Sequence, residues 1–345
     1  MAQLLIDMPA ESASRLLTLS LLEQLSVHGA YPAGQPAVPD TARDTAAVAT
    51  RGVAYRAVLN RLRGCVVLYD EMLSESISRK VRRRLRSIAK AANTLHDVDV
   101  QLIWLAQPDH AGQAKLAAQW LADRLARRRE RFASRLAQVQ EDARPLKRLA
   151  KRMSVYTTAI HLDEMNVSLS FGALTGQRLA AAGTTLRAAI SGMSARDGAS
   201  DLRRVRRVAD HLVYLLEPVR STADVEPLTE MAHELRIALE RLRETIVVSD
   251  VLLAGARRIG ALQMVQRVRR AVEPADLHSG NGDGTTPPTA SVLPDEIAPG
   301  LLSLAERLRE ERAHAFAEFA TRWLEPENAA FFAQVEHVAV RLGNR

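Results

Sequence analysis

Three features of the 345-residue sequence predict an all-α fold. From about residue 41 to residue 272, apolar residues recur three and four positions apart, as do Val58, Leu62, Cys65, Val66 and Tyr69. Strand-like alternation is scarce, and aromatic residues make up only 4% of the chain, which leaves little of the material that strands favour. Pro and Gly gather at a few breaks, so the intervening segments are long enough for helices.

The predicted elements follow these breaks in order. A short helix over residues 16–27 is followed by a Pro- and Gly-rich linker over residues 29–39. The main helical region then begins near Thr41, with breaks near residues 107–109, 143–145, 195–198, 217–218 and 226–227. A second Gly- and Pro-rich linker over residues 275–300 is predicted not to be helical. Two amphipathic helices, residues 301–324 and 328–342, end the chain.

This C-terminal tail contains five of the fourteen aromatic residues, namely Phe316, Phe319, Trp323, Phe331 and Phe332. A helix pair that folds back on the body explains them most simply. A partner-binding surface is the alternative. A third interpretation is that the acidic tail covers the basic body and mimics its ligand.

The charge is distributed unevenly. The formal net charge is +7, but residues 275–345 carry 11 acidic and 6 basic residues, so the rest of the chain has a net charge of +12. Such an excess attracts polyanions. The single cysteine, Cys65, excludes a disulfide framework and a multi-cysteine zinc site, and it favours a reducing cytoplasm. Neither a signal peptide nor a membrane span is predicted, and no cofactor is expected.

Two predicted helices carry basic stripes. Arg56, Asn60 and Arg63 share one helix face because they are spaced at i, i+4 and i+7. The following helix carries Arg82, Arg86 and Lys90 at i, i+4 and i+8. Two adjacent basic stripes repel each other unless water solvates them or an anion bridges them. A solvated face and an anion site are therefore the two interpretations.

These residues resemble the CHAD family, whose helical half-domains carry an H-x-x-R-x-x-x-R-R-x-R helix and a later R-D-x-D-V ending. Arg56, Arg61 and Arg63 match the first motif, and residues 95–100 (Leu-His-Asp-Val-Asp-Val) match the second. The sequence departs from the family at Val53, which replaces the histidine, and at Asn60, which replaces an arginine. His96 stands where the family has the arginine before Asp97.

The second half can be aligned in two registers. In the preferred one, residues 202–218 form the motif helix, Arg203 occupies the histidine position, and Tyr-Leu-Leu-Glu-Pro ends the segment. In the rival register, residues 233–243 form that helix. Under the preferred register, residues 233–243 belong to the next helix and present His233, Arg236 and Arg243 as a facing basic stripe. Asp210 and Val213 then replace two family arginines.

The resemblance implies a duplicated helical bundle with a short C-terminal helical extension. The expected organisation is an N-terminal helix and linker over residues 1–40, halves over 41–165 and 166–274, a flexible linker over 275–300 and the acidic tail over 301–345. It also implies non-catalytic binding of inorganic polyphosphate and, as in some members, association with polyphosphate granules. The implied binding residues are Arg56, Arg61, Arg63, Arg82, Arg86, Lys90, Arg203, Arg206, His233, Arg236 and Arg243. Histidines beside phosphates, His233 above all, should protonate more readily.

Other functions have weaker sequence support. A degenerate CHAD scaffold that binds a protein through its tail is one alternative. An HD-type metal phosphohydrolase is another, with His96 and Asp97 joined by ligands such as His161, Asp163 and His211. Nucleic acid is disfavoured as a partner because few aromatic residues interleave with the basic stripes.

Overall fold

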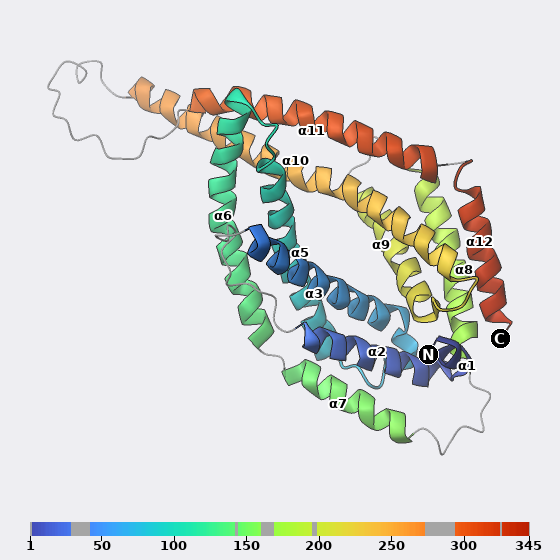
Figure 1. Ribbon diagram of the computed structural model, residues 1–345. Coiled ribbons are helices and arrows are strands. Elements are labelled where there is room, and N and C mark those ends of the chain that lie inside the picture. The colour runs from blue at the N-terminus through green and yellow to red at the C-terminus, as the bar shows by residue number, and fades with distance from the viewer. Residues whose placement is uncertain are drawn as a thin grey trace. The chain divides into compact units, whose positions relative to one another are not determined.

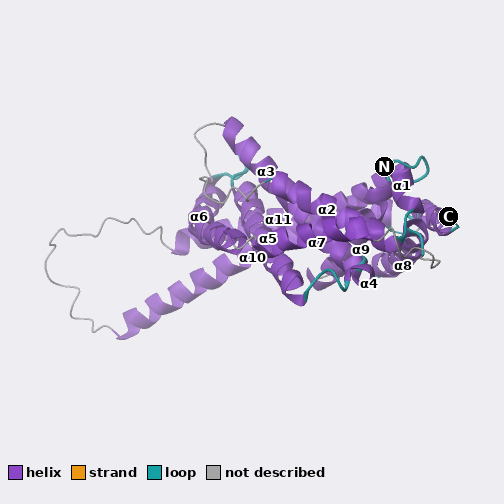
Figure 2. Cartoon of the chain, turned by 90° about the horizontal axis from the view of Figure 1, so that it is seen from below, coloured by secondary structure: helices purple, strands orange, loops and turns teal. Residues whose placement is uncertain are grey.

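The computed structural model describes residues 2–28, 42–141, 144–159, 169–194, 199–272, 294–324 and 326–344 (Figure 1). This part of the chain is helical and contains no strand, which confirms the all-α prediction (Figure 2). The elements are α1 (Ala2–Asp7), α2 (Ala10–Val27), α3 (Ala42–Leu68), α4 (Asp70–Leu73), α5 (Arg79–Leu105), α6 (Gly112–Glu141), α7 (Arg144–Ala159), α8 (Phe171–Ser191), α9 (Ala199–Leu216), the 3-10 helix η2 (Glu217–Val219), α10 (Glu226–Val272), α11 (Pro294–Trp323) and α12 (Ala329–Gly343). None of these helices is long and apolar enough to cross a membrane.

Two helices begin earlier than the sequence pattern predicts. The N-terminal helix α2 starts at Ala10 because small residues such as Ala10 and Ala13 are buried there, and these give a weak apolar periodicity. Helix α11 starts at Pro294, inside the segment predicted to be a non-helical linker. Proline fits the first position of a helix, which needs no N–H donor. The remaining linker residues, 273–293, lie outside the described part.

The contacts group the chain into two lobes. The first lobe contains Met1–His96, Arg129–Arg243 and His314–Arg345, and the second contains Asp97–Arg128 and Glu244–Ala313. This grouping differs from the predicted division into consecutive halves, linker and tail. The physical reason is that α5, α6, α10 and α11 are long helices, and each contributes residues to both lobes.

The first lobe includes the end of the C-terminal tail in its core. Helix α12 lies beside α8 (Figure 1), where glycines of α8 allow a close approach of the two backbones. A Cβ atom on Gly176 would lie 2.5 Å from the carbonyl oxygen of Ala339. Four of the five tail aromatics are buried: Phe319, Trp323, Phe331 and Phe332. Their burial matches the prediction that the tail folds back on the body.

The second lobe has a small polar network around α11. The indole N–H of Trp104 donates to Glu311 over 2.7 Å, and Arg307 donates to Glu311 over 2.9 Å. Arg307 also contacts Asp109 at 3.2 Å. The indole of Trp104 and the guanidinium of Arg307 donate to the same carboxylate, and Arg307 also pairs with Asp109. This network therefore connects α11 to the end of α5 and to the segment that follows it.

Candidate anion-binding site

Basic side chains from separate helices of the first lobe converge on the carboxylate of Glu240 in α10. The Nε of Arg206 (α9) lies 3.0 Å from one carboxylate oxygen, and Nη1 of Arg243 lies 3.1 Å from the other. The second oxygen also lies 3.8 Å from Nη1 of Arg56 (α3) and 3.9 Å from Nε2 of His96 (α5). We call these five residues the Glu240 cluster. Spacing predicted the basic face of α3, and the family resemblance implied the basic positions of α9 and α10; here arginines from all three helices lie near one carboxylate.

The charges in this cluster shape its ionisation. Burial opposes ionisation of Glu240, yet His96, Arg206 and Arg56 outweigh it and lower the pKa of this carboxyl. Burial raises the pKa of neighbouring Asp210, which the arginines only partly offset. The pKa of His96 is lowered, mainly by burial. Glu240 is therefore a carboxylate that the surrounding cations hold charged.

A second polar layer follows along the same helices. Asn60 of α3 and Asn93 of α5 exchange amide hydrogen bonds of 3.4 and 3.5 Å. Arg236 acts electrostatically on Asp210, whose Oδ2 lies 4.0 Å from Nε of Arg206. Asn60 and Asp210, two departures from the family motif, thus occupy the layer next to the Glu240 cluster.

A third layer forms around Glu217 at the end of α9. Arg61 of α3 makes an ion pair with Glu217, and Nε2 of His233 (α10) lies 3.7 Å from the same carboxylate. The pKa of His233 is lowered, first by its burial and then by Arg236. The predicted residues Arg61 and His233 are therefore brought together, with an acidic residue between them.

We call these three layers together the basic strip. It contains five arginines, namely Arg56, Arg61, Arg206, Arg236 and Arg243, and three carboxylates, namely Asp210, Glu217 and Glu240. The strip has a net excess of two positive charges when its histidines are neutral. Seven residues of α10 separate His233 from Glu240, a rise of about 10 Å. An extended anion would therefore meet successive arginines along it.

The other predicted residues lie elsewhere in the first lobe. Arg63, Arg86 and Arg203 are exposed, and Arg63 acts with Arg207 to lower the pKa of His211, after the larger effect of burial. Arg82 is ion-paired with Asp70 and donates to the carbonyl of Ile77. The structure thus does not place the stripe of Arg82, Arg86 and Lys90 in the Glu240 cluster.

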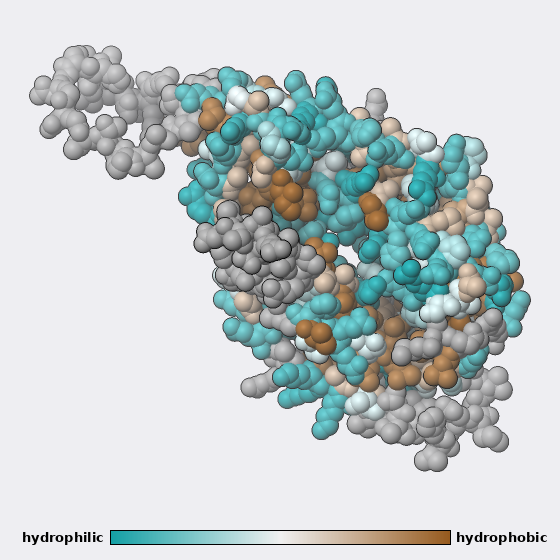
Figure 3. All heavy atoms as spheres, in the orientation of Figure 1, coloured by the Kyte–Doolittle hydropathy of each residue, from teal (hydrophilic) through white to brown (hydrophobic). Residues whose placement is uncertain are grey.

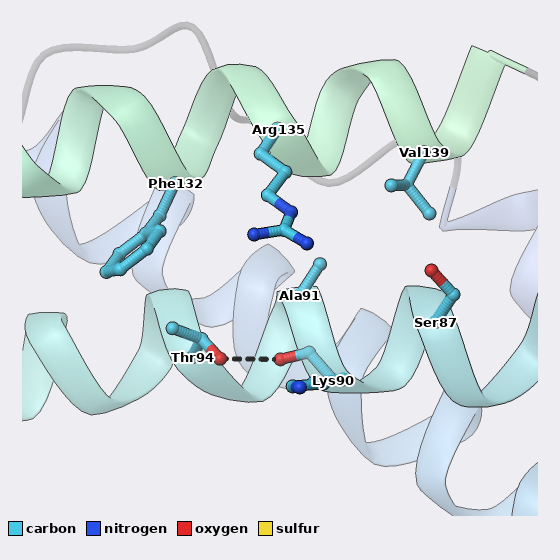
Figure 4. A pocket seen from close by; sticks show the side chains of 7 residues that line it. All are labelled: Ser87, Lys90, Ala91, Thr94, Phe132, Arg135 and Val139. Atoms are coloured by element: carbon cyan, nitrogen blue, oxygen red, sulfur yellow. Dashed lines mark hydrogen bonds between the residues drawn. The ribbon is translucent and has the colours of Figure 1, made fainter.

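Lys90 instead lines a pocket between α5 and α6 (Figure 4). Arg135 extends from α6 toward α5 between Phe132 and Val139, and the hydroxyl of Thr94 donates to the carbonyl of Lys90 over 2.8 Å. The pocket has no carboxylate among its lining residues, which are Ser87, Lys90, Ala91, Thr94, Phe132, Arg135 and Val139. Lys90 therefore shares its surroundings with a second cation, Arg135.

Sequence reasoning missed the acids of the strip. Glu240 lies four residues after Arg236 and three before Arg243. This helical spacing is the signal that could have placed it on the same side of α10 as the two arginines. His96 was predicted only as a motif departure and as a metal ligand in the phosphohydrolase alternative, not as a member of the anion site. In the described part of the chain, no three His, Cys, Asp or Glu side chains are grouped to hold a metal ion. His161 and Asp163 of the phosphohydrolase hypothesis lie outside it.

The buried histidines predict a pH-dependent stability. The pKa of His211 is lowered first by burial and then by Arg207 and Arg63. As the pH falls through about 6.5, the ordinary pKa of histidine, the unfolded chain therefore binds a proton at this residue before the folded chain does. Between pH 7.5 and pH 6 the free energy of unfolding should therefore decrease. His211→Gln should reduce this dependence, as measured by urea denaturation at each pH. The exposed His337→Gln is the control. Parallel curves for wild type and His211→Gln would contradict this assignment.

The comparisons with known proteins agree with this helical architecture. No curated protein matches the chain. Its fold is similar to the crystal structure of the CHAD domain from the plant Ricinus communis, with a TM-score of 0.56 and 14% sequence identity over 95% of this chain and 92% of that chain. A sequence model of the CHAD domain matches residues 53–268, which include α9 and most of α3 and α10. Because that match spans more than half of this chain, the chain belongs to the CHAD family.

Proposed function

We propose that the protein binds inorganic polyphosphate without catalysing a reaction, and that the basic strip is the binding surface. The observation that carries the proposal is the convergence of arginines from α3, α9 and α10, with Arg56, Arg206 and Arg243 within 4 Å of one carboxylate. Guanidinium groups donate paired hydrogen bonds to phosphate oxygens and stay charged at every physiological pH. The family resemblance implies the same ligand.

Exposed cations elsewhere in the first lobe add to its positive charge. Arg63, Arg86 and Arg203 are exposed in the first lobe, and none of them forms an ion pair with another described residue. They can exchange water and counterions for phosphate oxygens at low energetic cost. Binding should therefore be tight in low salt and weaken steeply as salt is added. Association with polyphosphate granules in the cytoplasm would follow from this affinity.

The tail gives less support to a function in protein binding. Phe319, Trp323, Phe331 and Phe332 are buried in the first lobe, so they are not presented to a partner. On the face shown in Figure 3, hydrophilic side chains predominate and hydrophobic ones form separate patches. Large contiguous apolar areas are what usually mark protein interaction sites.

A salt titration tests the proposed function. Long-chain polyphosphate and an RNA of equal total charge are titrated into the full chain at about 50 and about 200 mM salt. We expect polyphosphate to bind more tightly than RNA, because the strip offers arginines without stacking platforms. Absence of polyphosphate binding at the lower salt concentration would overturn the proposal.

Arg236→Gln is the sharpest single-residue test of this surface. Arg236 acts on Asp210 and His233, but it forms no ion pair with a described residue, so its loss leaves no buried carboxylate without its partner. Polyphosphate affinity should fall roughly three- to tenfold and the salt dependence should become shallower. Lys151→Gln on α7 removes an exposed charge of the same sign and should leave the affinity nearly unchanged. Equal affinities of the two variants would exclude Arg236 from the site.

A further inference from the structure

Glu240 has the contacts that a bound anion would have. Its two carboxylate oxygens are engaged separately, one by Arg206 at 3.0 Å and the other by Arg243 at 3.1 Å. Arg56 and His96 approach the second oxygen from α3 and α5 at 3.8 and 3.9 Å. Three arginines, from α3, α9 and α10, and one imidazole, from α5, are thus arranged around a single negative group. The Glu240 side chain is only 21% exposed, so this arrangement lies largely below the surface.

The chemistry of a condensed phosphate chain matches this group closely. Each internal phosphate carries one negative charge shared by two non-bridging oxygens, as a carboxylate does. The donors around Glu240 would therefore satisfy such a phosphate without any change in net charge. Arg206 can transfer its ion pair, and Arg243 its charge-assisted hydrogen bond, from a carboxylate oxygen to a phosphate oxygen.

We propose that Glu240 occupies the place of one internal phosphate and that polyphosphate binds by displacing it. This inference rests on the proposed function and adds a regulatory element to it, because Glu240 becomes a competitor built into the site. The observed affinity is then the intrinsic affinity of the arginines multiplied by the fraction of molecules in which Glu240 has moved away.

The surroundings of Glu240 allow this displacement. Asp210 lies in the next layer as a second negative charge near Glu240, which favours the departure of one of the two carboxylates. The carboxylate retains some contact with solvent, so it can turn toward water through rotation of its own side chain. A short anion must meet the cost of displacement with one contact. A long chain also gains contacts with Arg236 and Arg61 further along the strip, so the competitor selects for long polyphosphate.

The test compares Glu240→Gln with Glu230→Gln in the full chain. Both substitutions are on α10, and each removes one negative charge. Unlike Glu240, Glu230 is exposed, and its contact with Arg220 is long, at 3.9 Å. With long-chain polyphosphate at pH 7.5 and fixed salt, Glu240→Gln should bind roughly tenfold more tightly than wild type. Glu230→Gln should bind within about twofold of wild type, since it changes only the long-range charge. Equal effects of the two substitutions, or weaker binding by Glu240→Gln, would overturn the inference.

The outcomes separate this inference from the proposed function. If wild type does not bind polyphosphate, the proposed function fails. If wild type binds and Glu240→Gln behaves like Glu230→Gln, only the competitor role fails. If Glu240→Gln does not fold, Glu240→Asp is used instead. It keeps the negative charge but places the carboxylate on a shorter side chain, farther from the arginines. The competitor role predicts that Glu240→Asp binds more tightly than wild type; unchanged or weaker binding would reject it.

Discussion

Replacing Gly176 with alanine should destabilise the first lobe by about 2 kcal/mol or more. An added Cβ would lie 2.5 Å from the carbonyl oxygen of Ala339 and 2.8 Å from the backbone nitrogen of Gly343. Both atoms belong to the backbone of α12, so no side-chain rotation relieves the clash, and α8 and α12 must move apart. Overpacking of this kind typically costs about 1 to 3 kcal/mol, and occasionally more. The higher helix propensity of alanine relative to glycine offsets only about 1 kcal/mol of this cost.

Gly260→Ala is the matched control. Gly260 lies within α10, and an added Cβ would have no atom within 4 Å. Its substitution should therefore stabilise the protein by up to about 1 kcal/mol through helix propensity alone. Urea denaturation followed by circular dichroism should show opposite shifts of the two midpoints. A stabilising Gly176→Ala would mean that α12 does not pack on α8 as described.

This interface shows how far the sequence predicted the tail. The spacing of Phe331, Val335, Val338 and Leu342 predicts one apolar helix face, and these residues are buried. The receiving surface was not predicted, because the glycines of α8 contribute no apolar side chain to a periodic pattern. Close backbone approach depends on the absence of a side chain, and periodicity measures only the side chains that are present.

The basic stripes were predicted with similar partial success. The spacing of Arg56 and Asn60 on α3 predicts one face, and both side chains lie in the basic strip. The predicted stripe on α5 has two different surroundings in the structure. A step of four residues advances about 40° beyond a full turn, so Arg82 and Lys90 diverge by about 80°. Arg82 consequently meets Asp70, whereas Lys90 lines the pocket with Arg135.

The second repeat shows what only the folded chain reveals. The preferred register makes Arg206 the counterpart of Arg56, and the two arginines approach the same carboxylate from α9 and α3. That placement fits the preferred register. Helical spacing cannot indicate which acid lies opposite a basic face, because the partner comes from a different helix. Glu240 and Glu217 therefore emerged as central groups only when α3, α9 and α10 were seen together.

The double substitution Arg56→Gln and Arg206→Gln should cause the largest loss of polyphosphate binding. Each arginine can donate a charge-assisted hydrogen bond to phosphate, and such bonds contribute about 1.5 to 3 kcal/mol each. Losing two should weaken binding by about 100-fold or more in low salt. The slope of log affinity against log salt should fall by about two, one for each lost phosphate contact. Arg243 remains 3.1 Å from Glu240, so the carboxylate keeps a partner and the variant should fold.

A second double variant, Lys147→Gln and Lys151→Gln on α7, separates site contacts from net charge. Both lysines are exposed and belong to the first lobe, and their loss removes the same two charges. If polyphosphate is held in the basic strip, this variant should keep an affinity within about threefold of wild type, since neither lysine forms an ion pair with a described residue of the strip and exposed charges are screened by salt. Equal weakening by the two double variants would show that polyphosphate responds to the overall positive charge of the body. In that case the convergence of Arg56 and Arg206 on Glu240 would be a structural ion cluster without a ligand.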